Sequence, residues 1–515
     1  MCGRSGYLAG LMSAAALISA THAQAAVTIL SAATANMICS GGICAPTAKS
    51  AVLNVGDLET LLASGNVTVT TTGTGVQAND IDVKAALGWS SSGALSLLAN
   101  KSIAIDNPVS ISGLSGLTLQ TDGKNGTLSF GKKGNVSFAN LSSQLTIDGT
   151  AYTLVGNITT LAMDIAANPS DAFALAASYD AGGDGAYTTS PIGTVFTGTF
   201  EGLGNAISNL TVAGGTNVNG EEIEGLFAEV GLNGTVRNVG LTNANILVPG
   251  AANVGGGLAG ANLGVIDFCY TSGTVAGEKG KQNTGPFEGG LIGENGGTVE
   301  NSYSTASVTG LERSAVGGLV GVANDEIIIA SYATGEVSGN IVGGLVGDSN
   351  GGAIADSYAT GNVKIAKYKF YGNVGGGLVG IDESGAINDS YATGAVHGTS
   401  GSEAGGLVGG NGAAINFSYS TGAVTGGAGS IVGGLIGDDG SPPGSLTDTY
   451  WDTDTSGITN LSQGAGNIAN DPGIAGLTTA QFQSGLPAGF DPTVWAEKSR
   501  IDDGFPYLLA NKPGK

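Results

Sequence analysis

The sequence is poor in the residue types on which many binding and catalytic sites depend. Of its 515 residues only two are histidines, and 18 basic residues stand against 41 acidic ones, which gives a formal net charge of −23. Nucleic-acid phosphates need clustered lysines and arginines, so this balance argues against a nucleic-acid partner. It also disfavours anionic membrane surfaces. The acid excess is most simply explained as a means of keeping the protein soluble.

The scarcity of histidine and the missing motifs narrow the possible chemistry. Beyond the N-terminal 25 residues, His397 is the single histidine and no His-Glu-x-x-His occurs, so zinc proteolysis has no visible ligands. No Gly-Lys-Ser/Thr follows the glycine-rich blocks, and the glycine-aspartate nonapeptide of calcium-binding β-rolls is absent. We therefore expect no cofactor and no metal, and the sequence identifies no catalytic, cofactor-binding or metal-binding residue.

Acidic residues are nevertheless frequent in the expected loops. Oxygen ligands at turns suit a calcium ion, but solvated turns are the simpler interpretation, and we predict these side chains to be exposed. Carboxylate pairs for acid–base catalysis stay open, because stacked coils bring distant residues together. The loop acids in question are Asp348, Asp382, Glu383, Asp438, Asp439, Asp452 and Asp454.

Long apolar runs are also lacking, apart from one at the N-terminus. Arg4, an apolar stretch from Tyr7 to Ala20 and the small-residue pattern Ala23-Gln24-Ala25 together predict a cleavable export signal over 1–25. The alternative, an uncleaved anchor, fits less well because the run is short for a bilayer span of roughly 20 residues. We expect no membrane-spanning segment once the signal is removed.

Cysteines number four, and their positions indicate limited roles. Cys2 would leave with the signal, whereas Cys39 and Cys44 are close enough to close a small loop in an oxidising compartment. Two free thiols are the alternative. Cys269 stands where other repeats carry serine, so we interpret it as a small structural residue and not as a nucleophile.

The composition favours many short strands and a chain that extends in one dimension. The sequence holds 92 glycines and 41% apolar residues, too apolar for disorder and too rich in glycine for helices. A globular core stops growing at roughly 250–300 residues. Short runs with period-two alternation fill the region from Val67 to Val155, and the segment from Thr160 to Ala167 is helical in character and stops before Pro169.

A repeat begins near Glu224. A Gly-Gly-Leu-x-Gly block recurs at intervals of 26 to 33 residues, and a tyrosine follows each block after 12 to 15 residues. An aliphatic residue stands four positions before each tyrosine, and a valine stands five positions after the first six. Such a unit buries an apolar face only by stacking on its neighbours. The tyrosines are Tyr270, Tyr303, Tyr332, Tyr358, Tyr391, Tyr419 and Tyr450.

These patterns predict an all-β chain: a right-handed parallel β-helix, or β-solenoid, with a short helical interruption and a C-terminal cap. We expect the tyrosines to form a ladder at the strand spacing. Thr478 and Gln481 predict a capping box, and Leu477 to Leu508 is expected to cover the last coil. The expected divisions are a signal over 1–25, N-terminal coils over 26–157, a transition segment over 158–222, the repeat β-helix over 223–455 and the cap over 456–515.

The repeat unit resembles a known family. The stretch Gly376-Gly-Leu-Val-Gly-Ile-Asp-Glu-Ser-Gly-Ala-Ile-Asn-Asp-Ser-Tyr-Ala-Thr-Gly-Ala-Val396 is similar to the GLUG motif repeat of bacterial surface proteins. The lead-in from Pro191 to Leu210 and the strands before Val155 resemble segments of filamentous-haemagglutinin-like proteins. Tyr450-Trp-Asp-Thr-Asp-Thr-Ser-Gly457 and Gly504-Phe-Pro-Tyr-Leu508 resemble their closing segment.

The resemblance implies an adhesin-like β-solenoid at the outer-membrane surface or outside the cell, and we predict attachment or matrix interactions without catalysis. The ligand is open among glycan, protein and abiotic surfaces. The alternatives are a polysaccharide-acting β-helix enzyme and a structural spacer of a larger exoprotein. GLUG repeats also occur in immunoglobulin-A-cleaving metallopeptidases, so the prediction of a non-enzyme rests on the missing catalytic residues.

Overall fold

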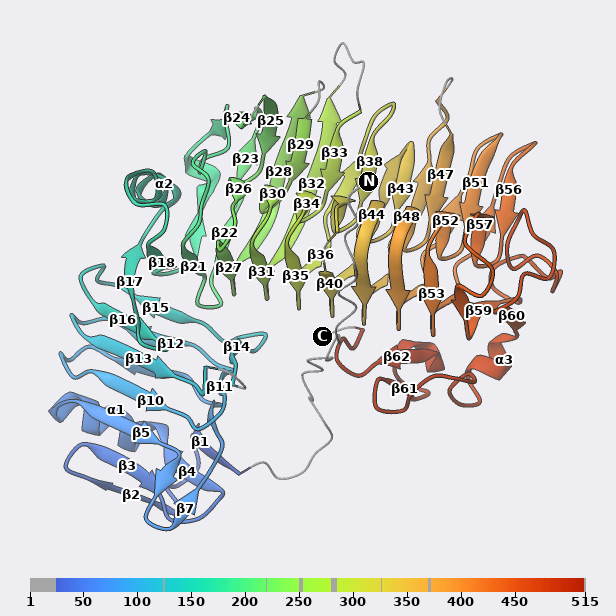
Figure 1. Ribbon diagram of the computed structural model, residues 1–515. Helices are drawn as coiled ribbons and strands as arrows, with labels where there is room; N and C mark the ends of the chain where they lie inside the picture. The colour runs from blue at the N-terminus through green and yellow to red at the C-terminus, as the bar shows by residue number, and fades with distance from the viewer. Residues whose placement is uncertain are drawn as a thin grey trace, which may run out of the picture.

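The chain forms two successive parallel β-helices in the computed structural model (Figure 1). The structure describes residues 25–513 except 124–125, 219, 250–252, 279–284, 326 and 369–371. Apart from Ala25, the predicted export signal lies outside the described residues. The α-helices of the described part are α1 (Val55–Ser64), α2 (Ile158–Ala167) and α3 (Thr479–Phe482). No helix in these described ranges has the length and apolarity needed to cross a membrane.

The first β-helix has three parallel sheets whose strands stack in register. Alternate residues of each strand face inward, so that Leu95 lies between Val67 and Leu117 of the neighbouring coils. The strands that we expected from the period-two alternation are all present. They are β5 (Val67–Thr70), β10 (Leu95–Leu98), β11 (Ile103–Ile105), β12 (Val109–Ile111), β13 (Gly116–Gln120), β14 (Leu128–Phe130), β15 (Val136–Phe138) and β16 (Gln144–Ile147). Four further strands of these sheets were not predicted: β1 (Ala26–Leu30), β4 (Ala51–Asn54), β8 (Asp80–Val83) and β9 (Leu87–Trp89).

The N-terminal end of this helix carries a hairpin and a short α-helix. Strands β2 (Met37–Ser40) and β3 (Ile43–Pro46) pair antiparallel, and a disulfide joins Cys39 to Cys44, which face each other directly. Helix α1 was not predicted from the sequence. Its N-cap is Asn54, whose side-chain oxygen accepts hydrogen bonds from two backbone N–H groups of the first turn. Asn54 followed by Asp57 was the available signal, because both residue types favour a helix start.

A buried ion pair connects the two β-helices. Strands β17 (Thr150–Val155), β18 (Ala172–Leu175), β21 (Thr199–Glu201) and β27 (Thr235–Arg237) follow one another across the junction, with the predicted helix α2 beside them. Arg237 Nε lies 2.8 Å from Glu201 Oε2, and Arg237 Nη2 donates to the Tyr152 hydroxyl over 3.2 Å. Glu201 is fully buried. Arg237 thus ties the first coils of the second helix to the end of the first.

The second β-helix confirms the expected fold class. Each coil places the same residues in the same columns: the repeat leucines lie in the core, and Ile266, Val299 and Ile328 are direct register partners. The aliphatic residues and valines that flank the tyrosines are buried in one continuous core. One complete coil consists of β34 (Ile292–Asn295), β35 (Thr298–Glu300), β36 (Tyr303–Ser304), β37 (Ser307–Thr309) and β38 (Ala315–Gly317).

The corner before each tyrosine is made by a residue other than glycine. Positions two before the tyrosines, such as Asn301 and Asp389, have a φ of 49° and 45°. The next residue is a buried serine in most coils, and it donates to the carbonyl two residues back while accepting a backbone N–H from the preceding coil, as Ser331 does. The repeat glycines serve close contact instead, because a Cβ atom at Gly377 would lie 2.1 Å from the Gly406 carbonyl oxygen.

The tyrosines form the expected ladder. From Tyr270 to Tyr419 successive rings are nearly parallel, with centroids 4.7 to 5.1 Å apart. The ladder lies outside the apolar core, and residues 478–508 cover its later members. Tyr391 and Tyr419 are consequently buried, whereas Tyr303 is half-buried.

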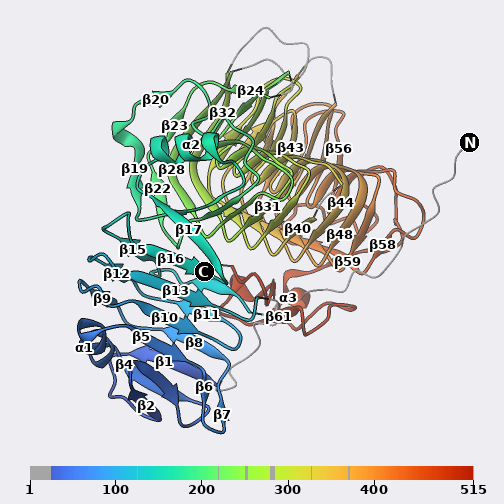
Figure 2. The same ribbon diagram turned by 60° about the vertical axis from the view of Figure 1, so that its left-hand side comes forward.

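The C-terminal cap divides into two parts, which differs from the expected arrangement. The end of the stack is closed by Trp451 and by β60 (Ile474–Leu477), which pairs with β59 (Thr449–Asp452). The predicted capping box at Thr478 starts α3, and the chain then returns along the flank of the helix, over the tyrosine ladder. In both views α3, β61 (Trp495–Glu497) and β62 (Pro506–Leu508) lie on the side of the second helix that faces the first (Figure 1, Figure 2). There the rings of Phe482, Phe490 and Trp495 each contact the ring of Tyr419.

Candidate functional site

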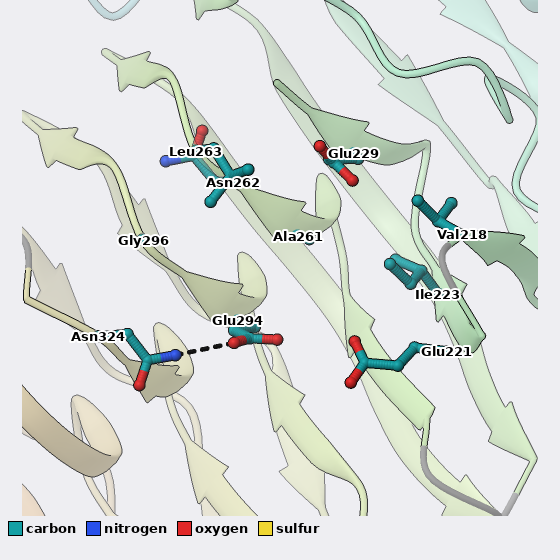
Figure 3. A pocket seen from close by; sticks show the side chains of 10 residues that line it. All are labelled: Val218, Glu221, Ile223, Glu229, Ala261, Asn262, Leu263, Glu294, Gly296 and Asn324. Atoms are coloured by element: carbon teal, nitrogen blue, oxygen red, sulfur yellow. Dashed lines mark hydrogen bonds between the residues drawn. The ribbon is translucent and has the colours of Figure 1, made fainter. Parts of the chain in front are cut away.

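A hollow of about 380 Å³ opens on the outside of the second β-helix, at its first coils. We call it the outer hollow. Its walls come from β25 (Glu221–Glu224) and from the outward side of the strands that follow the Gly-Leu bend, β26 (Phe227–Val230), β30 (Ala259–Asn262) and β34. The lining residues are Val218, Glu221, Ile223, Glu229, Ala261, Asn262, Leu263, Glu294, Gly296 and Asn324 (Figure 3).

Strand register decides which side chains meet in the outer hollow. Glu229, Ala261 and Glu294 are register partners in three successive coils, so two carboxyl groups stand roughly 10 Å apart along the axis with a methyl group between them. Glu221 projects from the opposite wall, and its carboxylate and that of Glu294 point toward one another (Figure 3). Ile223 supplies an apolar surface beside Glu221.

Burial raises the pKa of two carboxyl groups of the outer hollow, those of Glu294 and Glu229. Burial raises the pKa of Glu294, and the negative charge of Glu221 raises it further, while a 2.8 Å hydrogen bond from Asn324 Nδ2 lowers it. Burial alone raises the pKa of Glu229. No lysine or arginine is among the described lining residues. The hollow therefore combines carboxyl groups, amides and apolar groups, which together suit a ligand with hydroxyl or amine donors.

Most of the loop acids do not lie in solvated turns, so that prediction is wrong for them. Asp382, Asp439 and Asp452 are buried and Asp348 is half-buried. Burial raises the pKa of Asp382 to about 7 and that of Asp348 to about 6. Glu383 and Asp454 are exposed, as expected.

The buried acids have a structural explanation. Asp382 and Asp439 belong to a column of polar residues inside the corner that follows each repeat block, and in this column Asn411 Nδ2 donates to Asp439 Oδ1 over 2.7 Å. In β48 (Val379–Asn388) and β57 (Ile436–Asp439) the first, second and fourth residues are buried, a pattern that departs from simple alternation. Within the described ranges, no group of three or more His, Cys, Asp or Glu side chains is arranged to hold a metal ion.

The two residues with nucleophile or ligand chemistry that the sequence singled out lie apart from the outer hollow. Cys269 is buried in the serine column, where its backbone N–H donates to Ser302 Oγ over 3.0 Å. Burial raises the pKa of its thiol, which disfavours the reactive thiolate. His397 is exposed on β50 (Val396–His397).

Comparisons with known proteins give partial similarities. No family model matches the chain. A segment of 83 residues, 16% of the chain, is 39% identical to halomucin from Haloquadratum walsbyi (strain DSM 16790 / HBSQ001), of which it spans 1%. Because the match covers so little of halomucin, it gives no information on the activity of this chain.

Two solved structures are similar in part. One, described as a putative immunoglobulin A1 protease from Bacteroides ovatus, is 18% identical with a TM-score of 0.39, over 70% of this chain and 93% of the other. The second, described as IgA1 protease, is 20% identical with a TM-score of 0.36, over 56% of this chain and 20% of the other. Both names denote an enzyme, so the prediction of a protein without catalysis is contradicted, and we withdraw it. With TM-scores this low, the similarity does not transfer a protease activity to this chain.

Proposed function

We propose that this protein is exported and acts at the cell surface or outside the cell as an adhesin-like β-solenoid, attaching to a surface ligand through the outer hollow. The resemblance of its repeats to the GLUG motif of bacterial surface proteins supports this proposal, as does the signal-like pattern over 1–25. The local match to halomucin, which is named as a mucin, is in keeping with an extracellular place.

The disulfide supports export. Cys39 and Cys44 are opposite partners in the β2–β3 hairpin and are joined in the structure. Disulfides form and persist in oxidising compartments such as the periplasm and the extracellular space, and are rare where thiols are kept reduced. The hairpin belongs to the N-terminal end of the first β-helix, so the protein would carry this bond after the export signal is removed.

The outer hollow is the observation that carries the attachment proposal. Coil stacking fixes Glu229 and Glu294 in register on one rigid wall, and β25 presents Glu221 from the other. A site on strands is held more firmly than one on loops, so little conformational entropy is lost when a ligand binds. Charged groups form stronger hydrogen bonds with hydroxyl and amine donors than neutral groups do. Glycans and proteins both present such donors.

The attachment proposal can be tested with the double variant Glu221→Gln/Glu294→Gln. Each hydrogen bond to a charged group contributes about 1.5–3 kcal/mol, so we expect attachment to weaken at least roughly tenfold. The measurement is binding of labelled purified protein to glycan-coated, protein-coated and bare glass surfaces. Glu222→Gln is the matched control, because Glu222 is on the same strand but is not among the lining residues. Equal binding by the wild type and the double variant on every surface would rule out the outer hollow as the attachment site.

A polysaccharide-acting enzyme is the second candidate, and the facing carboxyl groups of Glu221 and Glu294 are the observation that favours it (Figure 3). A carboxylic acid with a raised pKa beside a second carboxylate is the pair that glycoside hydrolysis uses. The purified protein should then release new reducing ends from a polysaccharide, and Glu294→Gln should abolish this release while binding is retained. A lack of product with all polysaccharides tried, at pH values from 4 to 8, would exclude this activity on those substrates.

A further inference from the structure

Glu288 is a glutamate in the interior of the second β-helix. It lies in β33 (Phe287–Gly289), with 0% of its surface exposed. In the parallel register its position is taken by Val316 in the next coil and by Val342 in the coil after that, and both valines belong to the hydrophobic core. Glu288 therefore occupies a position where the next two coils place a valine side chain.

The carboxyl group of Glu288 is packed against backbone and makes no hydrogen bond with the residues that the structure describes. A Cβ atom at Gly277 would lie 2.5 Å from its Oε1, and one at Gly310 would lie 2.9 Å from its Oε2. The carboxyl group fits only because these two positions lack a side chain. A buried carboxylate without a partner is strongly disfavoured, so the folded protein holds this group in its protonated form.

Several titratable or charged groups lie near Glu288 in the fold or in the sequence. Glu224, two coils away in the same column, raises the pKa of Glu288 when it carries a charge, and burial raises the pKa of Glu224 itself to about 9. Tyr368, which follows β46 (Val363–Ile365), is a further titratable group that interacts with Glu288. The turn between β37 and β38 carries Glu312 and Arg313. The two strands stacked directly on β33, β29 (Asn253–Gly256) and β38, have no titratable side chain.

We infer that Glu288 makes the coils from β29 to β38 a pH-sensitive segment, closed while its carboxyl group is protonated and opened locally when that group ionises. Burial raises the pKa of Glu288 well above its ordinary value of 4.5. In the unfolded segment the group ionises near the ordinary value, so between the two values the folded form binds more protons. The stabilisation is therefore complete in acid and is lost as the pH rises. Because β33 leads directly into β34, the opening would also move Glu294.

Hydrogen exchange of the full chain at pH 5 and pH 8, expressed as protection factors, tests this inference. One ionising group changes the opening equilibrium by up to roughly tenfold per pH unit, so protection of β33 and β38 should fall by one to three orders of magnitude in the wild type. Glu288→Val, which copies the later coils, should show little change. Strands β51 (Ser402–Gly405) and β56 (Ile431–Gly433) are internal controls, because Ala404 and Val432 fill the corresponding positions.

The neutral variant Glu288→Gln provides a second measurement if Glu288→Val folds poorly. It too should remove the pH dependence at β38. Protection that is independent of pH in the wild type would overturn the inference. So would an equal loss of protection in the wild type and in both variants, because another group would then control the opening.

Discussion

Replacement of Arg237 by methionine should destabilise the junction of the two β-helices by about 3–5 kcal/mol, because it leaves a buried charge without its partner. Glu201 is fully buried, and Arg237 lies 2.8 Å from it. Arg237 also donates to the Tyr152 hydroxyl, so the substitution removes a contact between the two helices as well. Stacked repeats open locally, so the appropriate measurement is hydrogen exchange at β21 and β27.

The double variant Arg237→Met/Glu201→Met is the control for this prediction. Replacement of a whole buried ion pair by apolar groups is often neutral or stabilising, so most of the lost stability should return. Asn238 Nδ2 also donates to Glu201, over 3.2 Å, and this amide loses its partner in the double variant. If Arg237→Met leaves exchange at β21 and β27 unchanged, the ion pair does not hold the junction.

Trp495→Ala should release the C-terminal segment from the tyrosine ladder, at a cost of about 3–5 kcal/mol for a buried tryptophan. The Trp495 ring lies 6.0 Å from the ring of Tyr391 and 5.8 Å from that of Tyr419, between centroids. Its Nε1 donates to Asp389 Oδ1 over 2.8 Å. Limited proteolysis should cut residues 478–513 much faster in the variant, and the released ladder should promote aggregation.

Trp495→Phe separates packing from hydrogen bonding in this prediction. It keeps most of the apolar contact but loses the indole N–H, so its effect should be smaller, about 1–3 kcal/mol for a carboxyl group left without its donor. Unchanged proteolysis in Trp495→Ala would show that the segment is held elsewhere. Asn511 is the alternative point of attachment, because its Nδ2 donates to the Ser331 carbonyl oxygen over 3.2 Å.

The repeat could be predicted from sequence because each coil has the same residue types at the same positions. The leucines, the aliphatic residues and the tyrosines recur at fixed offsets, and these offsets become columns such as Tyr303 on Tyr332. The period-two runs predicted β5 and β10 to β16 of the first helix because alternate residues face its core. Helix α2 followed from its apolar periodicity and from Pro169, which ends it.

The flank and the interior could not be predicted in the same way. Trp495 meets Asp389 across 106 residues and Asn511 meets Ser331 across 180, and no local pattern encodes such distances. Glu288 and Asp382 are buried. Sequence analysis places acidic residues on the surface, because charged side chains are rarely buried. Glu221 and Glu294 come together in the outer hollow only through coil stacking. The sequence alone therefore did not distinguish them from the other glutamates.

The central claim is that this protein reaches the cell surface and mediates attachment there. The most direct test compares a deletion strain with its parent for surface attachment and biofilm, together with protease accessibility of the protein on intact cells. We predict weaker attachment in the deletion strain, restored by re-expression of the wild type, and cleavage of the protein by added protease on intact parent cells. Unchanged attachment, combined with cleavage of a polysaccharide by the purified protein, would contradict the claim and favour the enzyme.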